Sequence, residues 1–223
     1  MRVTAPRGAR RAALAALIVP ALVLAGCGGG DDGARAGKPS PSPSADLPTG
    51  DVDVPSGVTL TKAGTTLSFG QAAVVAYEPN TQKSTALSLT VRSVRTGRIA
   101  DLGGYQLDAA TKKSRPYYVR ATVQNVGTGD VGGAAVPLLA VDARNTLIQP
   151  TTFVNNGFAR CPSTALPRAF GAKKSLQTCL VYLIPEGGRL TALSYRPLQA
   201  FEPITWKGQI QPAAPATKPA PKK

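Results

Sequence analysis

Between residues 58 and 207, apolar and polar side chains alternate with a period of two, and no segment keeps an apolar face at helical spacing for three turns. Leu87, Leu89 and Val91 alternate with polar neighbours, and the odd positions of 119–123 follow the same rule. This period is typical of half-buried β-strands. Further strands are expected at 58–62, 67–78, 138–142, 146–153, 178–184, 190–195 and 204–207. Because Gly, Pro and Asn separate these short strands, the sequence predicts an all-β fold, an antiparallel sandwich or barrel.

The segment 178–184 differs from the other expected strands because it is apolar on both faces, apart from Thr178 and Tyr182. Strands that are buried on both faces typically show such continuous apolar runs. We therefore expect 178–184 to be a central strand that is covered on both sides.

A signal for export precedes this region. An apolar run at 12–24 follows several arginines and ends in Leu24-Ala25-Gly26-Cys27. The pattern resembles a bacterial lipoprotein signal, which implies that residues 1–26 are cleaved and that Cys27 carries palmitate at the outer face of the cytoplasmic membrane. The alternative is a membrane-spanning helix, but thirteen residues interrupted by Pro20 fall short of the roughly 20 that a bilayer requires. The sequence leaves the choice between general secretion and twin-arginine export open, although it favours the former.

Two segments of low complexity flank the expected domain. Residues 27–57 are rich in Gly, Ser, Pro and Asp, with a Pro-Ser repeat at 39–44, and predict a disordered tether with a reach of about 30 Å. Residues 208–223 alternate Pro, Ala and Lys and predict a second disordered tail. The folded domain is therefore expected at 58–207.

The cysteine count agrees with export. If Cys27 is lipidated, Cys161 and Cys179 remain, and two thiols in an oxidising compartment are expected to pair. Such a disulfide would close a loop of about 19 residues and stabilise the domain by about 3 kcal/mol in the chain-entropy model. The alternative is a pair of buried free thiols.

The expected domain is basic, since 58–207 contains 17 Lys and Arg against seven Asp and Glu. Outside a cell, such a surface meets anionic lipid headgroups and wall polymers rather than nucleic acid. The alternative is that the charge only keeps the domain soluble.

Three segments carry a resemblance to a known family. They are the aromatic-led strand and Asn-x-Gly turn at 117–127, the Cys-containing stretch at 175–187 and the Ile-Thr-Trp at 204–206. Their order resembles the telokin-like, immunoglobulin-type domains of secreted actinobacterial lipoproteins, over residues 66–207. The resemblance implies an immunoglobulin-like β-sandwich of unknown function and offers no catalytic residue to carry over. Asn125 is interpreted as structural, because Asn at a turn tolerates the left-handed conformation and bonds its own backbone.

The residue types argue against catalysis. The chain has no histidine, which removes the usual general base and the commonest metal ligand. Ser175 lies beside Lys173 and Lys174, but no Ser-x-x-Lys motif occurs. The carboxylates of 58–207 are scattered singly: Glu78, Asp101, Asp108, Asp130, Asp142, Glu186 and Glu202. We therefore expect neither an enzyme nor a cofactor or metal site.

One long connection, at 100–115, is a candidate recognition surface, because loops at the ends of sandwiches often bind ligands. Its cations and the aromatic residues near them would suit a carbohydrate or a polyanion: Tyr105, Lys112, Lys113, Arg115, Tyr117 and Tyr118. The alternative is a covering loop in which Leu102 and Tyr105 cap the core. Trp206 is expected to fill the end of the sandwich.

Two functions follow from these features. The first is a lipid-anchored extracytoplasmic module that binds another envelope component, expected to be a protein, without catalysis. The second is electrostatic retention on anionic wall polymer or phospholipid. The cations that would serve the second function are Arg92, Arg95, Arg98, Lys112, Lys113, Arg115, Lys173 and Lys174.

Overall fold

The computed structural model describes residues 52, 54–153 and 158–215 of the chain. The strands are β1 (Thr66–Ser68), β2 (Ala72–Asn80), β3 (Lys83–Thr96), β4 (Arg115–Asn125), β5 (Leu139–Asp142), β6 (Leu147–Ile148), β7 (Ser175–Ile184), β8 (Leu190–Tyr195), β9 (Ile204–Lys207) and β10 (Ile210–Gln211). Three short 3-10 helices accompany them: η1 (Ile99–Leu102), η2 (Thr111–Lys113) and η3 (Pro185–Gly187). No α-helix occurs in these ranges, so the all-β prediction is confirmed.

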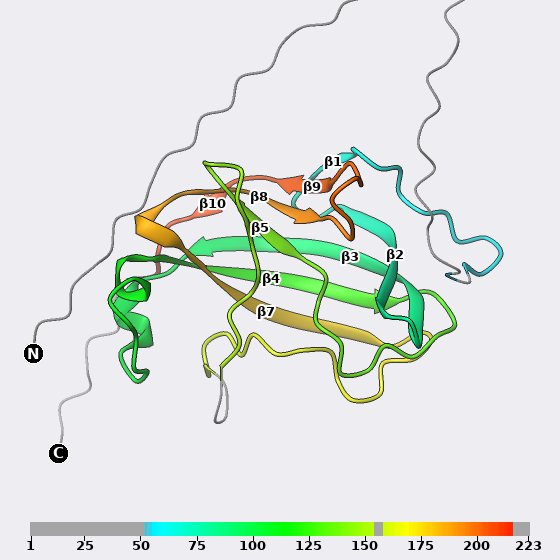
Figure 1. Cartoon of the computed structure of the whole chain (residues 1–223), viewed down its shortest axis with the longest axis horizontal. Coiled ribbons are helices and arrows are strands. Elements are labelled where there is room, and N and C mark those ends of the chain that lie inside the picture. Colours follow the sequence, from blue (N-terminus) through cyan, green and yellow to red (C-terminus); the bar gives the residue numbers. More distant parts are fainter. Residues whose placement is uncertain (1–51, 53, 154–157, 216–223) are drawn as a thin grey trace, which may run out of the picture. The chain divides into compact units, whose positions relative to one another are not determined.

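The strands form two sheets that pack face to face (Figure 1). Sheet A has the order β1-β9-β8-β5-β6, and sheet B has the order β10-β3-β4-β7, with β2 also paired to β3. Most pairs are antiparallel, as predicted, but β1 pairs with β9 and β10 pairs with β3 in parallel. β1 and β9 each precede a point where the chain crosses from sheet A to sheet B, into β2 and β10 respectively. These two strands therefore run toward the crossing side by side.

The main core lies between the two sheets and contains the largest buried side chains. Trp206 is fully buried in it and donates its indole N–H to the carbonyl of Gln71 at 3.0 Å. Tyr182 is also fully buried and donates its hydroxyl to the carbonyl of Leu138 at 2.7 Å. Each polar end thus has the partner that burial requires. The prediction that Trp206 fills the sandwich is confirmed.

The prediction for 178–184 is half confirmed. Both faces of β7 are covered, since Leu180 and Tyr182 enter the main core while Cys179 and Val181 enter a second cluster. The strand is not central, however, because β7 stands at the end of sheet B. A loop, rather than another strand, covers its outer face. The sequence of β7 cannot show whether a loop or a strand covers this face, because its side chains must be apolar in either case.

The exposed edge of β7 is paired with loop residues instead of a strand. Val181 accepts the backbone N–H of Thr151 at 2.7 Å and donates its own N–H to the Ser163 hydroxyl at 3.0 Å. The carbonyl of Cys179 accepts the N–H of Ser163 at 2.9 Å. Edge groups of Cys179 and Val181, in the middle of β7, are therefore not available to recruit another chain.

The other predicted strands show where the pattern misleads. The expected bounds 190–195 and 204–207 match β8 and β9. The segment 67–78 divides into β1 and β2 at Gly70, whose φ of 93° interrupts any strand. Residues 58–62 form no strand, although Thr61 bonds Val74 through both its N–H and its hydroxyl. Of 146–153, only β6 and an isolated bridge at Thr151 are strand-like.

The domain extends beyond its predicted end at residue 207. Ile210 and Gln211 form β10, which pairs with Val94 and Arg95 of β3, and Ile210 packs against the main core. The prediction of disorder from residue 208 is therefore wrong for these two residues. Its cause is that one apolar side chain among the Pro, Ala and Lys residues is enough to hold the segment on the sheet.

Several predictions lie outside the described residues. These are the signal peptide at 1–26, the lipidation site at Cys27, the tether up to residue 51 and the tail from 216. Within the described ranges, no helix has the length and apolar character needed to cross a membrane.

Candidate functional site

The predicted recognition surface around 100–115 does not form as expected. Tyr117 and Tyr118 are only 2% and 8% exposed, so neither can meet a ligand. Tyr117 points into the main core, whereas Tyr118 points to the opposite face of sheet B and donates its hydroxyl to Asp101 Oδ2 at 2.9 Å. The inclusion of both residues in a binding surface is therefore wrong. Neighbouring residues on a strand face apart, and here both faces are buried.

Tyr105 belongs to a cluster that covers one end of sheet B. Its ring lies 5.0 Å from that of Phe153 and 6.4 Å from that of Phe158, measured between ring centroids. Leu102 is fully buried in the same cluster. These contacts confirm the alternative interpretation, in which the connection is a covering loop that Leu102 and Tyr105 fasten to the core.

The predicted disulfide lies inside this cluster. Cys161 and Cys179 are bonded, their Cα atoms are 5.0 Å apart, and both residues are buried. Cys179 is on β7, and Cys161 is in the loop that covers the outer face and edge of β7. The bond therefore ties the cover to the strand that it covers, as the sequence predicts.

The predicted cationic set separates into distant groups. Lys112, Lys113 and Arg115 are exposed at the end of β4 that carries η2, where Arg115 pairs with Ile184. Lys173 and Lys174 are exposed just before β7, whose first residue pairs with Gln124 at the other end of β4. The nine steps along β4 from Arg115 to Gln124 span about 30 Å at about 3.3 Å per residue. No single site can use both groups.

Asn125 has the structural role that the sequence predicts, with one difference. It is fully buried, and its Oδ1 accepts the Thr85 hydroxyl at 2.6 Å and the Gly127 N–H at 3.1 Å. Its Nδ2 donates to the carbonyls of Gly129 and Phe170 at 2.7 and 2.8 Å. The bond to Gly127 is the expected bond to its own turn. Asn125 does not adopt a left-handed conformation, because the four bonds hold it in β4.

Two carboxylates that the sequence left without a role also hold turns. Asp130 Oδ1 accepts the N–H groups of Gly132 at 2.7 Å and Phe170 at 3.0 Å. Asp142 Oδ1 accepts the N–H groups of Thr146 at 2.8 Å and Arg144 at 2.9 Å. These bonds favour the ionised form, so the bond from Gly132 lowers the pKa of Asp130 and that from Thr146 lowers the pKa of Asp142. Both groups are ionised at neutral pH.

No group of three or more metal-binding side chains occurs among the described residues. The carboxylates that Asp130 and Asp142 supply are aimed at backbone amides of their own turns, which leaves them poorly placed for acid–base chemistry.

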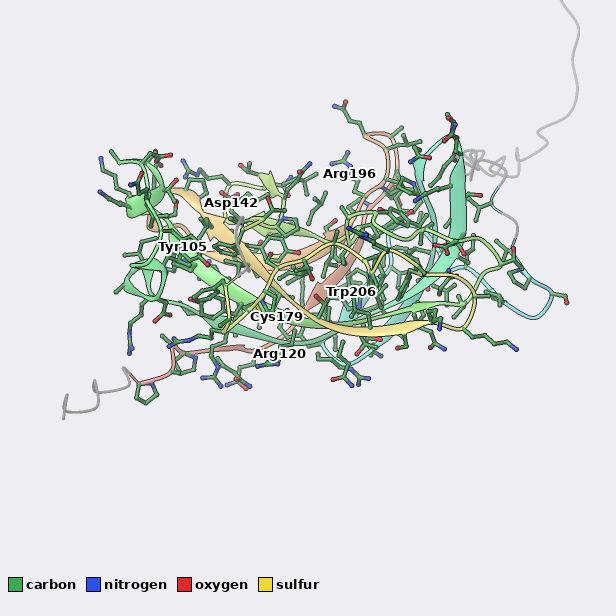
Figure 2. All side chains as sticks on the ribbon, turned by 90° about the horizontal axis from the view of Figure 1, so that it is seen from below. Tyr105, Arg120, Asp142, Cys179, Arg196 and Trp206 are labelled. Carbon is green, nitrogen blue, oxygen red and sulfur yellow. A yellow bond between two sulfur atoms is a disulfide. The ribbon has the colours of Figure 1, made fainter. Side chains whose placement is uncertain are left out.

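The outer face of sheet B is open beyond the aromatic cluster, and arginines stand on it. Arg92, Arg95 and Arg120 are all exposed, and Figure 2 shows Arg120 on the side of the sheet away from Trp206. Arg92 lies at an irregularity in the pairing of β3 with β4, where Ser93 and not Arg92 pairs with Arg120. Its Nε donates to the Thr122 hydroxyl at 3.0 Å. We name Arg92, Arg95 and Arg120 the arginine face.

The arginine face has no acidic partner within the described part of the chain, where the ion pairs involve only Arg144 and Arg160. Arg95 donates to the Pro212 carbonyl at 3.0 Å, and the Arg120 side chain has no described partner. Arg120 is absent from the cationic set that was predicted from the sequence. Its alternation with Val119 and Ala121 identifies it as outward-facing, but not as part of an uncovered area.

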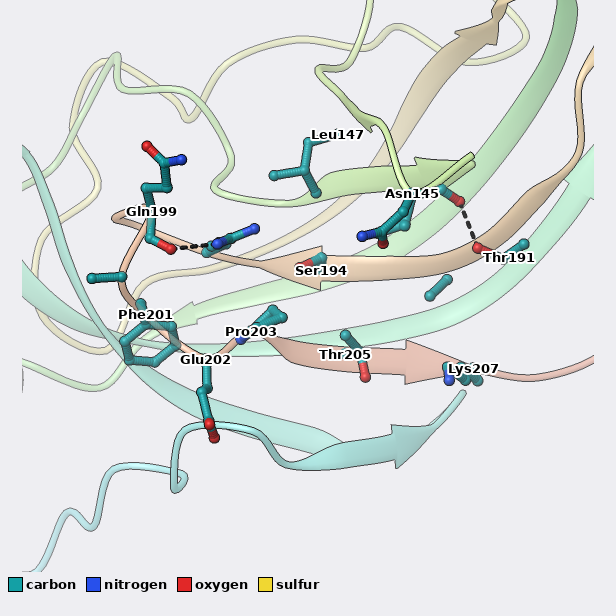
Figure 3. A pocket seen from close by; sticks show the side chains of 14 residues that line it. Asn145, Leu147, Thr191, Ser194, Gln199, Phe201, Glu202, Pro203, Thr205 and Lys207 are labelled. Carbon is teal, nitrogen blue, oxygen red and sulfur yellow. Dashed lines mark hydrogen bonds between the residues drawn. The ribbon is translucent and has the colours of Figure 1, made fainter. Parts of the chain in front are cut away.

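A hollow of about 550 Å³ lies on the outer face of sheet A (Figure 3). Its floor is made of small residues on three adjacent strands: Val141 of β5, Ala192 and Ser194 of β8, and Thr205 of β9. Larger side chains surround the floor, among them Leu147, Phe201 and Lys207. The hollow arises because small side chains face outward between Leu147 of β6, Phe201 of the loop after β8 and Lys207 at the end of β9.

Two polar atoms at this hollow lack partners. Ser194 Oγ and Arg196 Nε are the buried side-chain polar atoms for which the described part of the chain offers no hydrogen bond. Both residues line the hollow, and Ser194 is fully buried. The Arg196 guanidinium is held at one point, where Nη2 donates to the carbonyl of Gln199. Neither residue is predicted from the sequence, since neither belongs to a recognisable motif.

Comparisons with known proteins give one distant similarity. No protein-family model matches the chain, and a search of curated protein sequences finds no match. Among solved structures, the chain is similar to a secreted protein from Mycobacterium tuberculosis, MPT63, with 12% identity and a TM-score of 0.46. The match covers 66% of this chain and all of that one. The telokin-like family and the lipoprotein assignment stay predictions from the sequence.

Proposed function

We propose that this chain is a lipid-anchored, extracytoplasmic binding module that recognises another protein of the cell envelope without catalysing a reaction. The observation that carries the proposal is the arginine face, where Arg92, Arg95 and Arg120 stand exposed on an open sheet without acidic partners.

The type of cation favours a protein partner. Arginine is enriched at protein interfaces, where its planar guanidinium pairs with carboxylates in two parallel hydrogen bonds, whereas lysine is depleted there. The lysines of the domain stand elsewhere, with Lys112 and Lys113 on η2 and Lys173 and Lys174 before β7. An open face with arginines alone thus fits a partner that presents a cluster of carboxylates.

The location follows from the sequence signal and agrees with the sulfur chemistry. A lipobox ending in Cys27 follows a basic and apolar leader, and the two other cysteines form a disulfide. Disulfides persist in oxidising, extracytoplasmic compartments. The absence of histidine from the sequence supports the view that binding, and not catalysis, is the activity.

The test is capture of a partner from envelope extract. The full lipidated chain, held in detergent on a solid support, is exposed to the extract while the salt concentration is raised to about 1 M, at which the Debye length is about 3 Å. We expect one discrete protein to remain bound. The double variant Arg92→Ala/Arg120→Ala should lose it, and the matched control Lys112→Ala/Lys113→Ala should retain it.

Two results would contradict this proposal. One is the absence of any discrete protein in extracts from several growth conditions. The other is an equal loss of binding in both double variants, which would mean that net charge and not the arginine face holds the partner.

A second candidate function rests on the same face. Guanidinium groups also match phosphate oxygens, and the expected domain has ten more cationic than anionic side chains, 17 against seven. The module would then be retained on anionic wall polymer or phospholipid. In that case wall polymer or lipid, and no discrete protein, elutes as the salt concentration rises.

A further inference from the structure

We propose that the hollow on the outer face of sheet A binds a small organic acid, whose carboxylate bonds Ser194 Oγ and Arg196 Nε. The basis of the proposal is that two atoms without hydrogen-bond partners lie at the same hollow. The two buried side-chain polar atoms that lack a partner in the described part of the chain both belong to residues that line this one hollow. Ser194 is on β8 and Arg196 follows the last residue of that strand, so their Cα atoms stand about 7 Å apart.

The unpartnered atoms are unfavourable for folding alone. A buried donor without a hydrogen bond costs about 1–3 kcal/mol, and buried polar groups in native proteins nearly always have partners. Ser194 is fully buried, its neighbours Ala192 and Val141 carry no polar group, and the hydroxyl of Thr205, which pairs with Ser194 on β9, bonds the Thr66 hydroxyl instead. A hydroxyl at this position therefore has a use other than stability.

The charge of Arg196 determines the class of ligand. Arg196 has no carboxylate partner, since the ion pairs among the described residues involve Arg144 and Arg160 only. Lys207 adds a second cation at the rim, and Glu202 contributes one carboxylate. One N–H and one hydroxyl that both lack acceptors match the two oxygens of a carboxylate, and the guanidinium supplies the opposite charge.

The apolar side chains around the hollow favour a ligand whose carboxylate is attached to an apolar group. Leu147, which is 39% exposed, Phe201 and Pro203 line its sides. A volume of about 550 Å³ is in the range of small-molecule sites. An acid with a short aliphatic or aromatic tail would cover Leu147 while its carboxylate reaches the floor.

Access to the floor requires the Arg196 side chain to move. One hydrogen bond, from Nη2 to the Gln199 carbonyl, ties the guanidinium to the segment 197–200, which is exposed along its length. Displacing this segment breaks few buried contacts. The ligand would then replace an exposed hydrogen bond with two buried ones.

The site is independent of the proposed function. The hollow lies on sheet A, whereas Arg92 and Arg120 stand on sheet B, and the two sheets have their open faces on opposite sides of the sandwich. Failure of one proposal therefore leaves the other standing.

The experiment uses the full chain with Cys27→Ser, so that neither lipid nor detergent competes for the probe. Hexanoate is titrated into the isotope-labelled protein, and the Arg Nε–H and backbone amide resonances are followed by NMR. We expect saturable shifts of the Arg196 Nε–H and the Ser194 amide. Hexanamide, which has the same tail and no charge, should bind at least tenfold more weakly.

Variants separate the two bonds from general charge. Arg196→Lys retains the positive charge but lacks the Nε–H, and Ser194→Ala lacks the hydroxyl; each should raise the Kd for hexanoate at least tenfold. Arg189→Lys changes an exposed arginine outside the hollow and should leave the Kd unchanged. A dispersed amide spectrum shows that each variant is folded.

Three results would overturn the proposal. They are equal affinity for hexanoate and hexanamide, a response of Arg196 to inorganic phosphate but not to hexanoate, and the absence of any saturable shift at Arg196 and Ser194.

Discussion

Removing the side chain of Asn125 should cost more stability than any other single polar substitution in this domain. Four hydrogen bonds end on this buried side chain, two donated to carbonyls of Gly129 and Phe170 and two accepted from Thr85 and Gly127. Each contributes about 1 kcal/mol net, and Asn125→Ala leaves buried partners without a bond. We expect the free energy of unfolding to fall by about 3–5 kcal/mol, a large part of the roughly 5–15 kcal/mol typical of a domain.

The measurement is urea unfolding followed by the fluorescence of Trp206, the only tryptophan, and by circular dichroism. Asn80→Ala is the matched control, because it removes the same chemical group where one exposed hydrogen bond, from the N–H of Gln82, is lost. The control should lose less than about 1 kcal/mol. If Asn125→Ala loses less than about 1.5 kcal/mol, backbone packing and not the side chain holds this turn, and the reasoning fails.

Three further predictions concern other groups of the domain. Ser194→Ala removes a buried hydroxyl without a partner, so its urea midpoint should equal or exceed that of the parent; a loss above about 1 kcal/mol would contradict this. Replacing Cys161 and Cys179 together by Ala should cost about 3 kcal/mol, measured by urea unfolding, because the bond closes a loop with a sequence separation of 18. Burial raises the pKa of Tyr77 to about 12, so the stability that its neutral form contributes is complete below about pH 10 and is lost as the pH rises toward 12. Phenolate absorbance should therefore show Tyr77 ionising well above pH 10, and ionisation near pH 10 would refute its burial.

The sequence predicted the fold well because a period of two reports directly which face of a strand is buried. The bounds of β8 and β9 match their predicted ranges, and the two covered faces of β7 follow from its apolar run. The pattern cannot report what covers a face. A loop held by Cys161 covers the outer side of β7. The strand can therefore have two covered faces and still stand at the edge of sheet B, although it was expected to be central.

The same limit explains the errors at the candidate site. Tyr117 and Tyr118 face opposite sides of β4, and only the position of distant aromatic residues, such as Phe158, decides that the second side is buried too. Conversely, Arg120 can meet the proposed partner only if its part of sheet B stays uncovered. The lack of hydrogen-bond partners for Ser194 and Arg196 also depends on the three-dimensional structure. The residues that surround these two side chains become known only when the pairing of β8 with β5 and β9 is known.

The loop that covers β7 links the accessibility of this strand edge to the redox state of the disulfide. Thr151 and Ser163 bond the edge groups of Cys179 and Val181, and the loop that carries Ser163 is fastened to the same strand by the Cys161–Cys179 bond. A reducing agent would release the loop and leave a row of backbone groups ready to pair with a second copy. The disulfide thus does more than stabilise one chain, since it also holds the loop that blocks pairing at the β7 edge of sheet B.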